Sequence, residues 1–325
     1  MAIYTSEPAR SLFATAVALT LISASVLAQN LPAATRYFKS GVQRYRNGDL
    51  QGAASDFTRA IELNSRSAVD SNLNQSARSF ASLETHNPLN EILVVDRFNA
   101  QAYYNRGIVR FDIGDLDKAI ADFNRAIRID PRYTEAYIRR GRSQHSRGDH
   151  NGALADYSRA IALDPTSAFA FNNRGTVRQA MGDLAGAISD FDAALSIDPR
   201  LAEAFINRGA ARCIVGHLAG AISDLDYAIS LNPRSAMAFN NRGRVRQLRG
   251  DIVGAIEDYN RALAIDPLNA FAYANRGLAN LLQRKTVLAQ HDFARCIALR
   301  PDMKTSLDQR INEIEKALQP VADRR

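Results

Sequence analysis

Residues 170–199 read AFNNRGTVRQAMGDLAGAISDFDAALSIDP, and strings of the same pattern follow one another through most of this 325-residue chain. Apolar residues recur in this string with helical spacing, and the pair Gly182-Asp183 interrupts them near its middle. The pattern predicts a helical hairpin, with a first helix up to Met181 and a second helix from Leu184 to Ile197. Pro199 is expected to end the second helix, because proline lacks the amide hydrogen that a helix interior needs.

Glycine and proline recur through the chain with a period of 34 residues. The glycines are Gly107, Gly141, Gly175, Gly209, Gly243 and Gly277. The prolines are Pro131, Pro165, Pro199, Pro233, Pro267 and Pro301. A single hairpin cannot bury its apolar face alone, so a fixed period predicts hairpins stacked on one another around a continuous core.

With Gly, Ala, an aromatic residue, Ala and Pro at constant offsets, the period resembles that of the tetratricopeptide repeat family. The resemblance covers residues 100–303 as six consecutive repeats, and an earlier copy is recognisable in residues 34–65. It implies an all-α fold, a right-handed superhelical solenoid of helix-turn-helix repeats. Residues 304–319 are expected to form a capping helix, with one apolar face made by Leu307, Ile311, Ile314 and Leu318.

Residues 66–99 are the least regular part of the repeat region. One interpretation is a degenerate repeat, with a first helix over Ser67 to Leu83 and a shortened second helix over Leu89 to Val95. The other is a loop insert, because the segment is rich in Ser and Asn and lacks the glycine and both alanines of the pattern.

The first 28 residues differ in composition from the repeats. Leu12 to Ala28 is apolar, and Val26 and Ala28 suit cleavage before Gln29. Residues 1–28 are therefore predicted to be a signal peptide that exports the chain to the periplasm or cell envelope. The alternative is a retained membrane anchor in residues 11–28, and a membrane partner is expected in that case alone.

Composition excludes several classes of function. Two cysteines and five histidines rule out a disulfide scaffold and a multi-cysteine metal site, and no metal or other cofactor is expected. His145 and His150 are five residues apart, the wrong spacing for one helical face, so we do not expect them to bind a metal together. No phosphate-binding loop or nucleophile elbow occurs, so we expect no enzymatic activity. The net charge of +7 comes from charges that alternate in sign, so nucleic acid is not an expected partner.

Side chains of the first helices are the candidate binding residues, because these helices line the concave face of such a stack. A carboxamide both donates and accepts hydrogen bonds, so an asparagine ladder can hold the backbone of an extended peptide. The resemblance implies this role, since the glycosyltransferase branch of the family has such a ladder. In the competing interpretation the asparagines bond their own neighbours. An asparagine stands two residues before five of the six glycines, with Arg139 at that position in the remaining repeat, and three arginines are candidates for an anionic contact: Asn105, Asn173, Asn207, Asn241 and Asn275, with Arg139, Arg142 and Arg244.

A second ladder consists of an arginine before each glycine and an aspartate on the second helix. The arginines are Arg106, Arg140, Arg174, Arg208, Arg242 and Arg276. The aspartates are Asp122, Asp156, Asp190, Asp224, Asp258 and Asp292. We expect an internal ion pair in every repeat. A stripe that binds anions is the alternative, because several repeats carry a second arginine four residues after the first.

These observations predict a non-enzymatic scaffold that binds an extended peptide or a partner helix in its concave groove. Two alternatives stay open. The chain could be a structural subunit of an envelope assembly that forms homo-oligomers, or it could bind an anionic polymer, which steep salt dependence would reveal.

Overall fold

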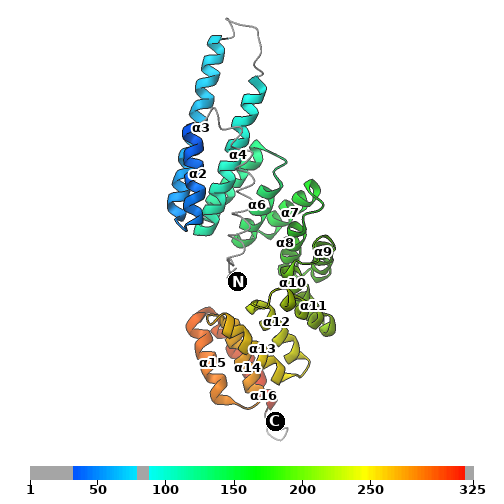
Figure 1. Cartoon of the computed structure of the whole chain (residues 1–325). Helices are drawn as coiled ribbons and strands as arrows, with labels where there is room; N and C mark the ends of the chain where they lie inside the picture. The colour runs from blue at the N-terminus through cyan, green and yellow to red at the C-terminus, as the bar shows by residue number, and fades with distance from the viewer. Residues whose placement is uncertain (1–31, 79–87, 319–325) are drawn as a thin grey trace. The chain divides into compact units, whose positions relative to one another are not determined.

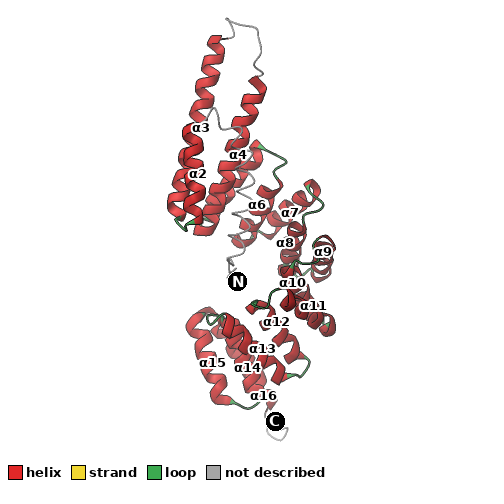
Figure 2. Ribbon diagram, viewed as in Figure 1, coloured by secondary structure: helices red, strands yellow, loops and turns green. Residues whose placement is uncertain are grey.

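The protein is all-α. The computed structural model describes residues 32–78 and 88–318, which form fifteen α-helices and one short 3-10 helix, with no strand in these two ranges (Figure 2). The predicted signal peptide, residues 1–28, lies outside them. No helix within the described ranges is long and apolar enough to span a membrane.

The chain divides into two compact units, Met1–Pro165 and Thr166–Arg325. In the first unit, consecutive helices pack as three antiparallel pairs (Figure 1). They are α2 (Pro32–Arg46) with α3 (Leu50–Arg78), α4 (Pro88–Ile113) with α5 (Leu116–Ile129), and α6 (Thr134–Arg147) with α7 (His150–Leu163).

The second unit contains four such pairs and a final helix. The pairs are α8 (Ala168–Ala180) with α9 (Leu184–Ile197), α10 (Ala202–Ile214) with α11 (Leu218–Leu231), α12 (Ala236–Leu248) with α13 (Ile252–Ile265), and α14 (Ala270–Leu282) with α15 (Thr286–Leu299). The 3-10 turn η2 (Pro301–Met303) leads into α16 (Lys304–Leu318), which packs its buried Leu307 against α14 (Figure 1).

The hairpin turns follow from the glycine-aspartate pairs. Gly148 ends α6 with φ 91°, a left-handed conformation that glycine adopts without steric cost. Asp149 then caps α7, since its carboxylate accepts a 2.9 Å hydrogen bond from the amide of Gly152. In the last repeat Arg284 replaces the glycine and still adopts φ 58°, so the turn keeps its geometry in a conformation that side chains disfavour.

The 34-residue glycines allow the two helices of a hairpin to approach closely. A Cβ atom on Gly175 would lie 2.7 Å from Cε1 of Phe191 and 3.1 Å from the carbonyl oxygen of Ala187. Phe191 is fully buried and fills the space between the two helices. The glycine and the aromatic residue of the pattern are therefore complementary in shape.

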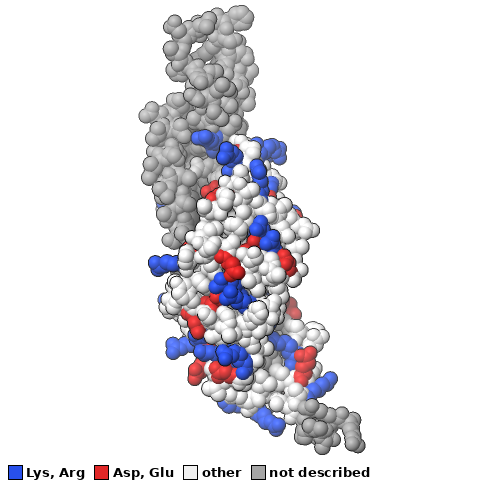
Figure 3. All heavy atoms as spheres, turned by 90° about the vertical axis from the view of Figure 1, so that its right-hand side faces the viewer, with Lys and Arg blue, Asp and Glu red and all other residues white. Residues whose placement is uncertain are grey.

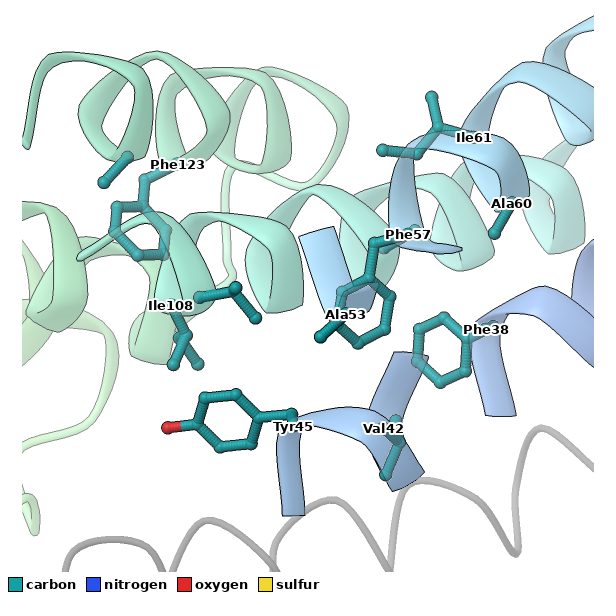
Figure 4. Packing of buried hydrophobic residues seen from close by; sticks show 12 residues of the cluster. Phe38, Val42, Tyr45, Ala53, Phe57, Ala60, Ile61, Ile108 and Phe123 are labelled. Carbon is teal, nitrogen blue, oxygen red and sulfur yellow. The ribbon is translucent and has the colours of Figure 1, made fainter. Parts of the chain in front are cut away.

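Aromatic and aliphatic side chains form the core of the first unit (Figure 4). Phe38 of α2 meets Phe57 of α3 edge to face, with ring centres 5.5 Å apart. Phe98 of α4 also packs against Phe38, with ring centres 5.5 Å apart. The core thus continues from the first hairpin into the second, as expected for stacked repeats.

Residues 66–78 and 88–99 are helical, and residues 79–87 lie outside the described ranges. α3 continues through Ser65 to Arg78, and α4 begins at Pro88. Ser65 stands where the other repeats have proline, so no residue there interrupts the hydrogen bonding of α3. Pro88 suits a helix start, where its missing amide hydrogen is not needed. The described residues 66–78 and 88–99 therefore lengthen two helices that belong to neighbouring hairpins.

Candidate functional site

The predicted ion pair is present in all six repeats. Each arginine before the glycine donates from Nε and Nη2 to the two carboxylate oxygens of its aspartate, at 2.5–3.0 Å. The aspartate side chains are only 3–6% exposed. This paired, two-point geometry is what a buried carboxylate needs, and the pairs join the two helices of each repeat.

The second arginines bond the same aspartates. Asp190, for example, accepts from Arg178 as well, at 2.9 Å. The equivalent contacts are Arg110 with Asp122, Arg212 with Asp224 and Arg246 with Asp258, at 2.8–3.0 Å. The positive charge of these second arginines is therefore paired with the aspartates of their own repeats. This argues against a free stripe of arginines that binds anions.

Within the second unit the ladder also joins a repeat to the one before it. Arg208 donates from Nη1 to Asp192, sixteen residues earlier, at 2.6 Å, while its other nitrogens bond Asp224, sixteen residues later. Arg242 does the same with Asp226 and Asp258. Each of these guanidinium groups also stacks on an aromatic ring three residues earlier, such as Phe205 under Arg208 at 5.3 Å.

We define the first-helix face as the surface formed by the first helices of the hairpins: α2, α4 and α6 in the first unit, and α8, α10, α12 and α14 in the second. Neighbouring helices of this set contact each other within each unit. The candidate asparagines and arginines all lie on them. These candidates fall into two classes. Some bond or pack against other residues of the protein, and the others bond no side chain of the described residues.

The asparagine ladder is partly engaged in bonds between repeats. Asn207 donates to the carboxamide oxygen of Asn172 at 3.0 Å, and Asn275 donates to Asn240 at 3.0 Å. Both bonds join residues 35 apart on adjacent first helices. Asn105 is 2% exposed, and its amide nitrogen has no partner among the described residues. For Asn207 and Asn275 the competing interpretation, in which the asparagine bonds a neighbour, matches the geometry.

Asn173 and Asn241 differ from Asn207 and Asn275. The residues 35 positions before them are Ile138 and Ile206, which offer no hydrogen-bonding group. Both asparagines are half-buried, and neither carboxamide bonds another side chain of the described ranges. A half-buried carboxamide without a protein partner can bond a ligand backbone.

In the first unit, Arg139 and Arg142 pack against aromatic rings. Burial opposes the charge of Arg139, but the nearby Tyr104 and Asp112 leave its pKa raised. Arg142 stacks on Phe111 at 4.9 Å. Asp112 in turn accepts a 2.5 Å hydrogen bond from Tyr45, which ties α2 to α4. These two candidates are therefore engaged in contacts between first helices.

In the second unit, the charge of Arg244 acts on the guanidinium group of Arg310. Arg244 lies exposed on α12, and Arg310 lies on α16. Partial burial of its guanidinium and the nearby charge of Arg244 lower the pKa of Arg310. Neither arginine is within ion-pair distance of an acidic residue in the described part of the chain. Arg244 was predicted from the sequence and Arg310 was not, although Arg310 continues the 34-residue series of ladder arginines beyond Arg276.

Groups that could hold a metal are few. No cluster of three or more His, Cys, Asp or Glu side chains suits a metal within residues 32–78 and 88–318. Asp190 with Asp192, and Asp224 with Asp226, bond arginines. The nearest to a metal site is a pair of histidines at the α6–α7 turn, His145 and His150. Cys213 and Cys296 are buried free thiols.

Family models match the repeats directly. Two models described as tetratricopeptide repeat match residues 100–133 and 170–201, and a third, described as TPR repeat, matches residues 141–182 and 248–283. None of the curated proteins compared with the chain is significantly similar to it in sequence.

Solved structures share the fold. A tetratricopeptide repeat protein from Parabacteroides merdae is 18% identical with a TM-score of 0.64, covering 87% of this chain and 99% of that one. The protein pilF from Pseudomonas aeruginosa is 17% identical with a TM-score of 0.58, covering 68% of this chain and 99% of that one. At these identities the likeness concerns the fold alone.

Proposed function

Because the chain is a tetratricopeptide repeat protein, and this fold generally serves as a scaffold for protein–protein interaction, we propose that its second unit binds an extended acidic peptide segment. The site is the first-helix face of α8, α10 and α12, together with Arg310 of α16. The proposed function is non-enzymatic. The observation that carries it is the contrast between the ladder arginines, all paired, and the like-charged Arg244 and Arg310, which pair with no described acidic residue.

The spacing of the carboxamides of Asn173 and Asn241 sets the length of the bound peptide. Asn173 and Asn241 lie on first helices two repeats apart, and neighbouring helix axes are about 8–10 Å apart, which gives a span of roughly 16–20 Å. An extended chain covers that distance with about six residues, at some 3.3 Å per residue. Each carboxamide can donate to a peptide carbonyl and accept from a peptide amide, so this contact does not depend on the peptide sequence.

The arginines define the charge of the segment. Burial and the nearby charge of Arg244 lower the pKa of Arg310, so an anion bound beside these guanidinium groups stabilises the charged form of Arg310. A carboxylate of the partner supplies that charge. Charges of both signs are interspersed over the face drawn in Figure 3, which does not present the continuous basic surface typical of a nucleic-acid binder.

The test is selection of a random dodecapeptide library on the purified full chain, followed by titration of the enriched peptides. We expect enriched peptides to carry Asp or Glu. Arg244→Gln with Arg310→Gln should weaken their binding about tenfold or more, and Asn173→Ala with Asn241→Ala by a few-fold for all sequences alike.

The matched control is Arg234→Gln with Arg249→Gln, which removes the same charge from exposed positions of the second unit. It should leave the affinity unchanged. Asn207 is left unchanged in all variants, because its bond to Asn172 joins two adjacent repeats. Equal binding by the Arg244/Arg310 variant and the native chain, or no enrichment of acidic peptides, would refute the proposal.

A further inference from the structure

Two imidazole rings face each other at the turn between α6 and α7. The Nδ1 atoms of His145 and His150 are 3.1 Å apart. Spacing along one helix argues against such a meeting, since residues five apart do not share a helical face. That argument is wrong here because the helix ends between them: α6 stops at Arg147 and α7 starts at His150.

The turn holds the two rings in place from both sides. Gly148 reverses the chain with φ 91°, and its amide bonds the carbonyl oxygen of His145 at 3.0 Å. Asp149 caps α7, so the backbone of His150 is fixed at the first helical position. Both histidines are half-buried, and their positions are therefore set by two helix ends and not by a free loop.

The rings meet at their nitrogen edges. Their centres are 5.0 Å apart and their planes are inclined by 41°, so the centre-to-centre distance clearly exceeds the distance between the two Nδ1 atoms. Two nitrogens bound at 2.0–2.1 Å to one metal lie about 2.9 Å apart for a right-angled pair and about 3.4 Å apart for a tetrahedral pair. The observed separation falls between these values without any movement of the backbone.

The charged side chains at this turn pair with one another. The nearby cation, Arg147, is engaged by Asp117 at 3.0 Å and by Asp149 at 3.6 Å, so it does not stand unbalanced beside the pair.

A further polar group between α6 and α7 lacks a partner among the described residues. Gln144 precedes His145, and its amide carbon lies 3.0 Å from the position that a Cβ atom on Gly152 of α7 would occupy. Its buried Oε1 atom accepts no hydrogen bond from the described residues. An oxygen of this kind is an acceptor for a metal-bound water at the same turn.

We propose that His145 and His150 form a binding site for a divalent transition-metal cation of the class that imidazole prefers, with Nδ1 of both rings as ligands. The described residues supply no third His, Cys, Asp or Glu, so water completes the coordination sphere. The site is therefore weaker than a four-ligand structural zinc site. In the metal-free protein the same separation suits a hydrogen bond between the two Nδ1 atoms; when the cation binds, the proton of the donating ring moves to its Nε2 atom, so that both Nδ1 lone pairs bind the metal.

The test is calorimetric titration of the full chain with Zn²⁺ alone at neutral pH. We expect one site, whose affinity falls tenfold or more in His145→Gln and in His150→Gln. The matched control is His217→Gln with His291→Gln, which removes two exposed histidines of the second unit and should leave that affinity unchanged. Unchanged affinity in both single variants, or no binding by the native chain, would overturn the proposal.

A second measurement does not depend on how the variants fold. Cu²⁺ added to the native chain at one equivalent should give an electron paramagnetic resonance spectrum with hyperfine coupling to two nitrogens. A spectrum of aquated Cu²⁺, or one unchanged between the native chain and a folded His145→Gln variant, would contradict the assignment.

Discussion

A single residue explains why the α6–α7 repeat departs from its neighbours in electrostatics. Four of the six ladder aspartates accept from two arginines, whereas Asp156 accepts from Arg140 alone, because Gln144 stands where those repeats have the second arginine. Burial raises the pKa of Asp156 above its ordinary value, and the Arg140 contacts only partly offset this. The ionised form of Asp156 is thus under-stabilised in the folded protein.

We expect Gln144→Arg to raise the free energy of unfolding by about 1 kcal/mol at pH 7. The new guanidinium stabilises ionised Asp156, so it lowers the folded-state pKa of Asp156. The gain is therefore present above that pKa and is lost as the pH falls through it. Urea unfolding at pH 7 measures the expected gain in the free energy of unfolding, and urea unfolding at pH 3 measures its expected loss.

The control for this prediction is Gln144→Met, which keeps the length of the side chain and adds no charge. It should not produce the gain that disappears in acid. An equal gain at both pH values would indicate packing, and would show that the charge of Asp156 is not the cause.

The arginine ladder and the asparagine ladder differ in how far the sequence predicts them. Arg174 and Asp190 could be paired in advance, because the two helices of one hairpin bring positions sixteen apart together in every repeat. Asn207 bonds Asn172 across two adjacent repeats, and that contact depends on how the first helices pack, which the period does not specify. His145 and His150 were missed for a related reason, since the helix end between them decides the contact.

At the scale of the helix pair, the 34-residue glycines set the distance between the two helices. Gly175→Ala should lower the free energy of unfolding by about 1–2 kcal/mol, because its Cβ would overlap Phe191 and the carbonyl of Ala187. Gly220→Ala, in α11, should raise it by up to about 1 kcal/mol, since the nearest atom to its Cβ is 3.5 Å away and alanine favours the helix.

Thermal or chemical unfolding of the two variants in parallel checks this pair, each being the control for the other. A common sign for both substitutions would mean that helix propensity, and not the close approach at Gly175, determines the outcome.

Helix boundaries were predictable where the glycine and proline of the repeat pattern are present, and not where one of them is missing. α9 runs from Leu184 to Ile197, as predicted. α3 extends to Arg78 because Ser65 does not interrupt it, and a sequence without its proline contains no signal for where the helix should end. Residues 66–99 therefore required the structure.

At the scale of the whole molecule, each repeat is stabilised by its immediate neighbours. Arg208→Ala removes bonds to Asp224 in its own repeat and to Asp192 in the preceding one. We expect a local loss of about 3 kcal/mol, with amide exchange roughly a hundredfold faster in α9, α10 and α11. Exchange in α14 and α15 should change little, because a repeat stack transmits stability mainly between adjacent units.

Hydrogen-exchange mass spectrometry of the full chain measures this profile, with Arg234→Ala as the exposed control. Uniform acceleration from α8 to α15 would show that the second unit unfolds as a single cooperative block, contrary to this expectation.

A ladder arginine such as Arg208 bonds one residue sixteen positions earlier and another sixteen positions later. This symmetry affects how a repeat protein can gain repeats during evolution. Within the second unit, a tandem duplication of one whole 34-residue block would supply each new junction with a donor and both acceptors. Replication slippage in the coding sequence could thus change the number of repeats in a single event. The lengthened protein would need no compensating substitution at the seam.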